Sequence, residues 1–284
     1  MDSNTQIEDQ RCVASAKMML ASCFNQLAML DNGKTAKEHT RKAIFYYDQA
    51  ISECARLKLS SPLWEALWER ASIARRLAEY SHFPKSRLFS CQAFLLNHAA
   101  LQLRAGRNDR AKIAHILKNL GNLHTSYALR SCRSRKRKEL AKAQGYFQEA
   151  AELYEQVDEL TNHSITLLGL AISKVQLALC SPKNSSLALA NQAISELKFA
   201  ANHIDEQEMP VYRSELARFL GIALVLSAYF SNSPDRQTTV VEADRVRGGS
   251  PEYFGGGIGR YPFCYGPSFS GAGMALGNAR YPSF

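Results

Sequence analysis

The segment KAIFYYDQAISE, residues 42–53, carries the pattern that decides the fold. Ala43, Tyr47 and Ala50 follow one another at steps of four and three residues, which places them on one face of an α-helix. A small side chain lets a neighbouring helix approach closely, and a bulky one fills the space beside it. The pattern therefore predicts a helix that packs on another helix.

Similar spacings of small residues return in three later segments. These are AFLLNHAALQL (93–103), GYFQEAAELYE (145–155) and LALANQAISEL (187–197). Aligning Ala50, Ala99, Ala150 and Ala193 gives repeat steps of 49, 51 and 43 residues. We expect Ala50, Ala99 and Ala150 to be buried where helices meet.

The alternating helices contain a glycine that follows a leucine, and this glycine would allow the same close contact from the first helix of each pair. The segments concerned are LGN (120–122), LLGLA (167–171) and FLGIA (219–223). The pairing of L-G on one helix with A-x-x-x-F/Y-x-x-A on the next resembles the tetratricopeptide repeat. Leu120 and Gly121 match the first-helix pattern, with His124 where an aromatic residue is usual, and Ala143, Phe147 and Ala150 match the second.

The resemblance covers residues 7–230 and implies a right-handed superhelix that binds a partner segment in its concave groove. The family's period is about 34 residues, so the longer steps here require longer helices or expanded turns. A generic α-solenoid and a 14-3-3-like bundle of nine helices are the alternative folds.

Helical periodicity and proline positions predict an all-α fold of nine helices. The expected ranges are 7–31, 34–58, 62–81, 84–105, 108–130, 136–157, 161–180, 184–203 and 209–230. Because the connections are short, consecutive helices should pack antiparallel.

Composition changes after residue 230 and predicts three parts. Residues 1–230 form the helical domain, 231–247 a polar linker, and 248–284 a flexible tail rich in glycine, proline and aromatic residues. The polar, acidic N-terminus predicts no secretory signal. The longest apolar run, 219–230, is too short to span a bilayer. We expect a cytoplasmic protein that also enters the nucleus if its basic segment is an import signal.

Sequence motifs for catalysis are absent: there is no HExxH, GxSxG or GxxxxGK[ST] pattern. The seven cysteines form no CxxC pair and are expected to be reduced thiols packed as small apolar side chains. We therefore expect neither catalytic activity nor a cofactor or metal site. An enzyme whose site has no recognisable motif is a third hypothesis.

The segment RSCRSRKRKEL, residues 130–140, is strongly basic within a chain of net charge +9. Like charges at this density repel one another, which favours a solvated loop or a frayed helix start. Its functional interpretation is a nuclear-import signal or an anion-binding patch. The residues concerned are Arg133, Arg135, Lys136, Arg137 and Lys138.

Two sets of residues are candidates for partner binding. Lys118 and Asn122, one helical turn apart, resemble part of the carboxylate clamp of some tetratricopeptide domains. In the tail, GRYPF (259–263) and ARYPSF (279–284) suggest four aromatic anchors, Tyr261, Phe263, Tyr281 and Phe284.

These features predict a scaffold or adaptor whose partner is a protein, acidic in view of the net charge, or a second copy of the chain. The alternative is a nuclear or nucleic-acid-associated regulator that uses the 130–138 segment and the aromatic tail.

Overall fold

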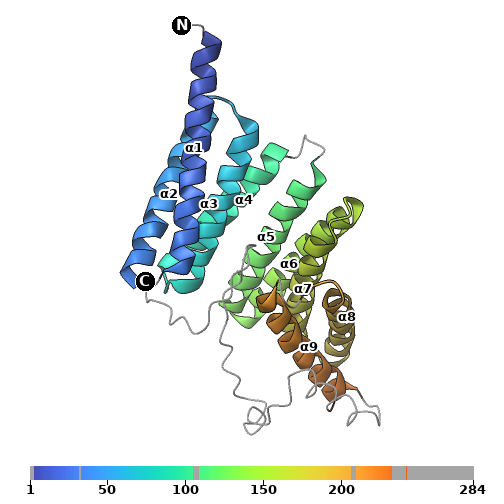
Figure 1. The fold of residues 1–284 in the computed structure, drawn as a ribbon. Coiled ribbons are helices and arrows are strands. Elements are labelled where there is room, and N and C mark those ends of the chain that lie inside the picture. The colour runs from blue at the N-terminus through green and yellow to red at the C-terminus, as the bar shows by residue number, and fades with distance from the viewer. Residues whose placement is uncertain (1–2, 32, 105–108, 206–208, 232–240, 242–284) are drawn as a thin grey trace. The chain divides into compact units, whose positions relative to one another are not determined.

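The computed structural model of the chain describes residues 3–31, 33–104, 109–205 and 209–231, together with Val241 (Figure 1). Within these residues the chain is all-α and contains no strand. Its helices are α1 (Ser3–Leu30), α2 (Gly33–Arg56), α3 (Ser60–Tyr80), α4 (Lys85–Arg104), α5 (Arg110–Leu129), α6 (Arg133–Gln156), α7 (Leu160–Ala178), α8 (Lys183–Ala201) and α9 (Pro210–Phe230). All nine expected helices are confirmed, with ends within four residues of the predicted ones.

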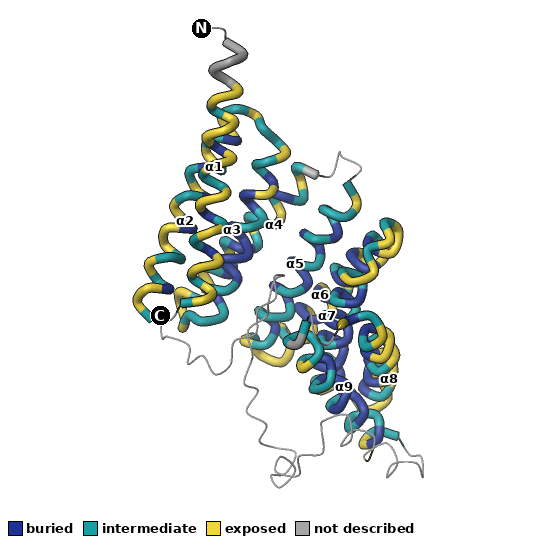
Figure 2. Tube along the Cα trace, viewed as in Figure 1, coloured by how far each residue is buried: buried dark blue, intermediate teal, exposed yellow. Residues whose placement is uncertain are grey.

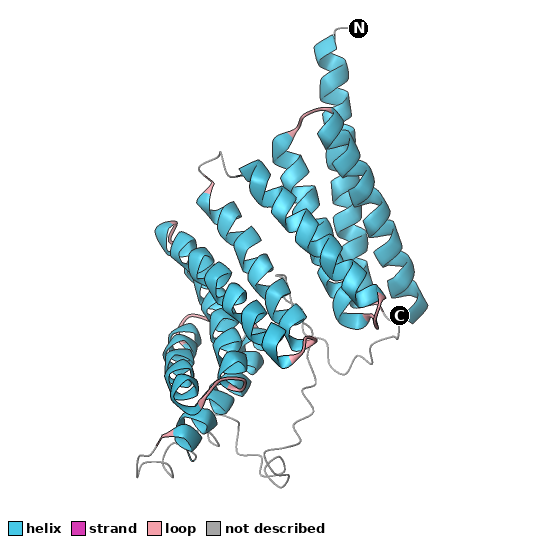
Figure 3. Cartoon of the chain, turned by 180° about the vertical axis from the view of Figure 1, so that it is seen from behind, coloured by secondary structure: helices cyan, strands magenta, loops and turns pink. Residues whose placement is uncertain are grey.

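The helices pack mostly against their neighbours in sequence, as antiparallel hairpins joined by short turns (Figure 3). They divide into two compact units. Unit 1 contains α1 to α4 and α5 up to Ser126, and unit 2 contains the end of α5 and α6 to α9.

The even-numbered helices share a repeat of 50 residues. Its first buried position holds Ala43, Ala93, Ala143 and Ala193, and its second holds Ala50, Ala100, Ala150 and Ala200. All eight side chains are 0% exposed. The steps of 49, 51 and 43 are therefore wrong, and so is the expected burial of Ala99, which is only half-buried. The steps of 49 and 51 arise in α4, where Asn97 occupies the position of Tyr47 and Phe147 and so hides the aromatic marker. The step of 43 arises in α8, where Ala193, at the first position, was aligned in place of Ala200.

The odd-numbered helices follow the same step, since α3, α5, α7 and α9 begin at residues 60, 110, 160 and 210. Ala78, Ala128, Ala178 and Ala228 are buried at equivalent positions near their ends. Equivalent turns also recur: Lys58 after α2 and Asp158 after α6 have φ of 55° and 57°. In both turns the next residue donates a backbone hydrogen bond five residues back, to Cys54 and Tyr154, which closes the helix end.

Each unit has its own apolar core (Figure 2). In unit 1, Ala21 of α1, Tyr47 of α2 and Ile73 of α3 form one cluster. In unit 2, Val175 of α7, Leu197 of α8 and Leu220 of α9 belong to another. Apolar residues at helical spacing supply these faces, and their burial stabilises the hairpins.

The cysteines depart from the predicted packing. Among the six that the structure describes, only Cys54 is buried, Cys180 is half-buried, and four are exposed: Cys12, Cys23, Cys91 and Cys132. Cys12, Cys23 and Cys91 lie on the solvent-facing sides of α1 and α4, and Cys132 lies in the turn before α6. None of the described helices has the length and apolar character that spanning a membrane would need.

Candidate protein-interaction surface

Helix α3 has two chemically different faces in unit 1. One is apolar: Ala66 and Ile73 join the core with α2, and Ala74 packs with Ala93 of α4. The other side carries polar and aromatic residues that contact α1 and α5. The sequence shows the apolar periodicity, whereas the polar contacts join segments about 50 residues apart and require the fold.

Beside the apolar packing of Ala21 against α3, the contact between α3 and α1 has a polar part. The Arg76 guanidinium donates a hydrogen bond to the side-chain oxygen of Asn25, which is itself buried. Glu69 lies near Arg76, and burial raises the pKa of its carboxyl group from 4.5 to about 7, partly opposed by Arg76 and reinforced by Glu65. Arg76 and Glu69 are thus half-buried ionisable groups on the side of α3 that meets α1.

The contact between α3 and α5 is aromatic at one end and polar at the other. The rings of Trp68 and His115 meet edge to face, with centroids 4.5 Å apart. The Ser126 hydroxyl donates a 2.9 Å hydrogen bond to Glu79, which also accepts one of 2.6 Å from Arg75. Burial and the nearby Lys118 lower the pKa of His115 to about 3, so its ring is neutral.

Lys118 and Asn122, predicted from sequence, belong to the same row of α5. Residues 115, 118, 122 and 126 follow at steps of three and four, so they share one side of the helix. Both ends of that row contact α3, and Lys118 and Asn122 between them are half-buried. We call this surface the odd-helix face of unit 1; its residues are Asn25, Trp68, Glu69, Arg76, Glu79, His115, Lys118, Asn122 and Ser126.

Buried polar groups in unit 2 link helices to one another. The Lys174 ammonium of α7 forms an ion pair with Glu196 of α8, and Lys136 of α6 donates to Gln176 of α7 over 3.5 Å. Burial raises the pKa of Glu196, although Lys174 opposes the shift. These contacts join groups of neighbouring helices within unit 2 and therefore serve packing.

Most of the basic segment is helical, because α6 begins at Arg133, three residues before the predicted start at residue 136; of the two expectations, a solvated loop or a frayed helix start, the second is closer. Arg133, Arg135, Arg137 and Lys138 are exposed. Repulsion between exposed like charges on a helix costs only about 0.2–0.5 kcal/mol per pair. The segment just after them, with Leu140 and Ala143 fully buried, anchors the helix to its unit.

Local contacts also hold the start of this segment. The Arg135 guanidinium lies over the Tyr127 ring, 5.0 Å from its centroid. The first turn of α6 contains no acidic residue. Its exposed helix N-terminus, itself electropositive, therefore adds to the local positive charge.

The predicted tail, residues 248–284, lies outside the described residues, and so do its proposed anchors Tyr261, Phe263, Tyr281 and Phe284. Most of the predicted linker, 231–247, lies outside them as well. Among the residues that are described, no three His, Cys, Asp or Glu side chains gather as metal ligands.

Comparisons with known proteins give no family for this chain. No protein-family model matches the sequence, and no curated protein shows significant similarity to it. What can be said of its function rests on the residues and contacts described above.

Proposed function

We propose that this protein is a non-catalytic scaffold or adaptor that binds a segment of a partner protein across the odd-helix face of unit 1. One observation carries the proposal: polar and charged side chains line consecutive odd-numbered helices, where they are partly removed from water and do not belong to the apolar core. Partly desolvated polar groups give strong, directional contacts to a ligand.

The chemistry of the face favours a partner segment with carboxylate groups. Arg76, Lys118, Asn25 and Asn122 supply cationic and amide donors on three odd-numbered helices. Such donors, distributed along an extended peptide, would hold side-chain carboxylates or a C-terminal carboxylate. Glu69 interacts with Arg76, and Glu79 accepts a hydrogen bond from Arg75. These acidic groups therefore reduce the positive charge of the face.

We further propose that the hairpins continue as a right-handed superhelix like that of tetratricopeptide proteins. The 50-residue repeat of buried alanines and the leucine–glycine pairs of the odd-numbered helices support this arrangement. In such a superhelix the odd-numbered helices line the concave side, where a partner segment would lie.

A peptide-display selection on the full chain tests the proposal. We expect enrichment of acidic peptides whose affinity falls by at least tenfold in Lys118→Glu, because a donor is replaced by a like charge. Arg87→Glu makes the same charge change at an exposed position of α4 and is the matched control. Selected peptides that bind wild type and Lys118→Glu equally would contradict the proposal.

A second candidate function is nucleic-acid association through the start of α6. The observation that favours it is the set of exposed cationic side chains at a helix N-terminus that has no acidic residue. Phosphate groups would be attracted by both the side chains and the helix dipole. The tail could add aromatic stacking to this contact.

Titration of a fluorescent single-stranded oligonucleotide at several salt concentrations tests this function. Binding should weaken steeply as salt rises, and the quadruple change of Arg133, Arg135, Arg137 and Lys138 to Ala should abolish it. Helical content should be unchanged, since these side chains are exposed. Binding that is insensitive to the quadruple change would exclude the segment as a nucleic-acid contact.

A further inference from the structure

Helix α1 has an exposed apolar row on the side away from its neighbours. We call it the α1 stripe; its residues are Val13, Ala16, Leu20, Cys23, Leu27 and Leu30. Every one of them is exposed, and the four largest are 48%, 45%, 42% and 50% exposed in chain order. Figure 2 shows the exposed positions recurring along α1.

The stripe is separate from the side of α1 that packs in unit 1. Among residues 8–30, for which burial is described, Ala14, Ala21 and Asn25 are the buried ones, and at about 100° per residue they point away from the stripe. Asn25, the α1 residue of the odd-helix face, therefore lies off the stripe. Binding of a partner segment at that face leaves the stripe available.

The spacing within the stripe alternates between three and four residues over its whole length. This is the a/d pattern by which two helices pair along a seam. On one side the stripe is flanked by the exposed, uncharged Cys12, Met19 and Gln26. On the other side lies Lys17, which is half-buried and forms an ion pair with Glu53 of its own copy at 2.5 Å. A row of this length facing water is unfavourable, because exposed apolar surface of this kind is stabilised when it is covered.

We propose that the α1 stripe pairs with the α1 stripe of a second copy of this chain, antiparallel, around a two-fold axis between Leu20 and Cys23. A two-fold interface must be complementary to itself. The α1 stripe meets this condition when a second stripe lies against it in the opposite direction. Ala16 then faces Leu27 of the second copy, and Leu20 faces Cys23, so each small side chain meets a leucine. Val13 faces Leu30 at both ends.

A parallel pair lacks this complementarity. It places Ala16 against Ala16, which leaves a gap, and Leu20 against Leu20. It also brings Asp9, which lies in line with the stripe and is exposed, against its own copy. The antiparallel arrangement avoids both costs.

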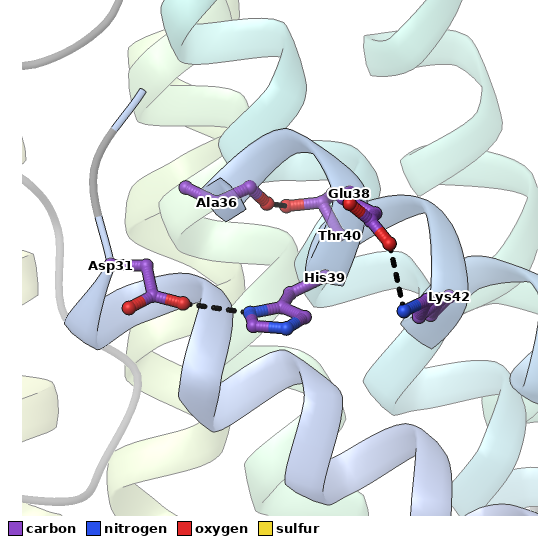
Figure 4. Close-up of polar contacts among 6 residues, drawn as sticks. All are labelled: Asp31, Ala36, Glu38, His39, Thr40 and Lys42. Carbon is purple, nitrogen blue, oxygen red and sulfur yellow. Dashed lines mark hydrogen bonds and ion pairs between the residues drawn. The ribbon is translucent and has the colours of Figure 1, made fainter. Parts of the chain in front are cut away.

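Charge at the two ends of α1 supports the antiparallel direction. In that arrangement Asp9 approaches the turn between α1 and α2 of the second copy, where Lys34 is exposed. Asp31, the acidic residue at that turn, is already engaged by His39 of its own copy, whose Nδ1 lies 2.7 Å from its carboxylate (Figure 4). The neighbouring Glu38 is likewise paired with Lys42 at 2.8 Å (Figure 4).

Light scattering of the full chain during size exclusion tests the pairing. The wild type should be a dimer at about 50 μM, where a micromolar Kd leaves little monomer. Leu20→Glu should raise the Kd about 100-fold or more, because it buries unpaired carboxylates. Leu27→Glu is a second variant with the same expectation. Leu95→Glu, at a 71% exposed leucine of α4, is the matched control and should remain a dimer.

A monomeric wild type, or a Leu20→Glu variant that folds and stays dimeric, would overturn the proposal. Cross-linking decides the direction. In a background with Cys23→Ala, Cys12→Ser, Cys91→Ser, Cys132→Ser, Cys180→Ser and Cys264→Ser, which keeps only the buried Cys54, a short bismaleimide should join Ala16→Cys only to Leu27→Cys, in a mixture of the two variants. Linkage of Ala16→Cys to itself, or no linkage in the mixture, would contradict the antiparallel seam.

Discussion

Gly169 of α7 lies directly against the ring of Phe147 of α6: a side-chain carbon at position 169 would come within 2.7 Å of Phe147 Cε1. Phe147 is 1% exposed, so its ring has little room to move. Glycine at this position lets the first and second helices of neighbouring hairpins approach closely. The sequence predicted such a contact from the LLGLA segment, although not its partner.

Gly169→Ala should therefore destabilise the fold by about 1–3 kcal/mol, the usual cost of overpacking a core. The gain in helix propensity, about 1 kcal/mol, offsets only part of this. Urea unfolding measures the difference. Gly145→Ala is the matched control, since nothing lies within 4 Å of its added carbon, and it should stabilise by about 0.5–1 kcal/mol. Equal effects of the two changes would contradict the close contact.

The 50-residue repeat predicts opposite tolerances at two adjacent alanines of α4. Ala100→Leu should destabilise by about 2 kcal/mol, because Ala100 is 0% exposed at a helix contact. Ala99→Leu should cost less than about 1 kcal/mol, because Ala99 is half-buried. Thermal unfolding compares them directly. If Ala99→Leu lost more stability than Ala100→Leu, the register expected from the sequence would be correct and the 50-residue repeat would be wrong.

Burial of Glu69 predicts a pH dependence of stability. Its carboxyl pKa is raised from 4.5 to about 7 by burial, so between these values the folded chain keeps a proton that the unfolded chain releases. Stability from this group therefore falls as pH rises through that window. Glu69→Gln should lose this trend and be more stable than the wild type at pH 8.

The comparison must separate Glu69 from His115. Burial lowers the pKa of His115 from 6.5 to about 3, so this group reduces stability as pH falls below 6.5. Both proteins contain His115, so its contribution cancels when the free energy of unfolding of Glu69→Gln is subtracted from that of the wild type at each pH. If urea midpoints of the two proteins run parallel from pH 4.5 to 8, Glu69 is not buried as described.

The ion pair between Lys174 and Glu196 should be costly to break from one side. Lys174→Ala leaves a largely buried carboxylate without its partner and should destabilise by about 3 kcal/mol. Lys142, whose exposed ammonium lies 3.8 Å from Glu139, provides the control: Lys142→Ala should cost at most about 0.5 kcal/mol. Chemical denaturation of both variants shows whether burial makes this difference.

Local signals in the sequence were sufficient to predict the helices. Proline positions and apolar periodicity predicted all nine, and the Ala–aromatic–Ala spacing identified the buried faces of α2 and α6. The same spacing failed in α4, where Asn97 replaces the aromatic residue and donates a hydrogen bond to the Ala93 carbonyl over 2.9 Å. An amide whose NH2 group is hydrogen-bonded within its own helix can be buried, but it gives no apolar signal.

The candidate face could be predicted only in part. Lys118 and Asn122 were found because they share one helix, whereas Asn25 with Arg76, and Trp68 with His115, meet across helices far apart in sequence. The start of α6 was predicted three residues too late because charge density was given more weight than the buried residues that follow the basic segment. Repulsion between exposed charges on a helix costs little free energy, so burial of Leu140 decides where α6 forms.

Hydrogen exchange of the full chain, with and without an acidic peptide from the selection, tests the central claim most directly. Binding across the odd-helix face of unit 1 should slow exchange in α1 near Asn25, in α3 near Arg76 and in α5 near Lys118, since a bound segment suppresses local opening. The start of α6 should exchange as before. Protection confined to residues 130–140, or unchanged exchange in all three odd-numbered helices of unit 1 at saturating peptide, would contradict the proposal.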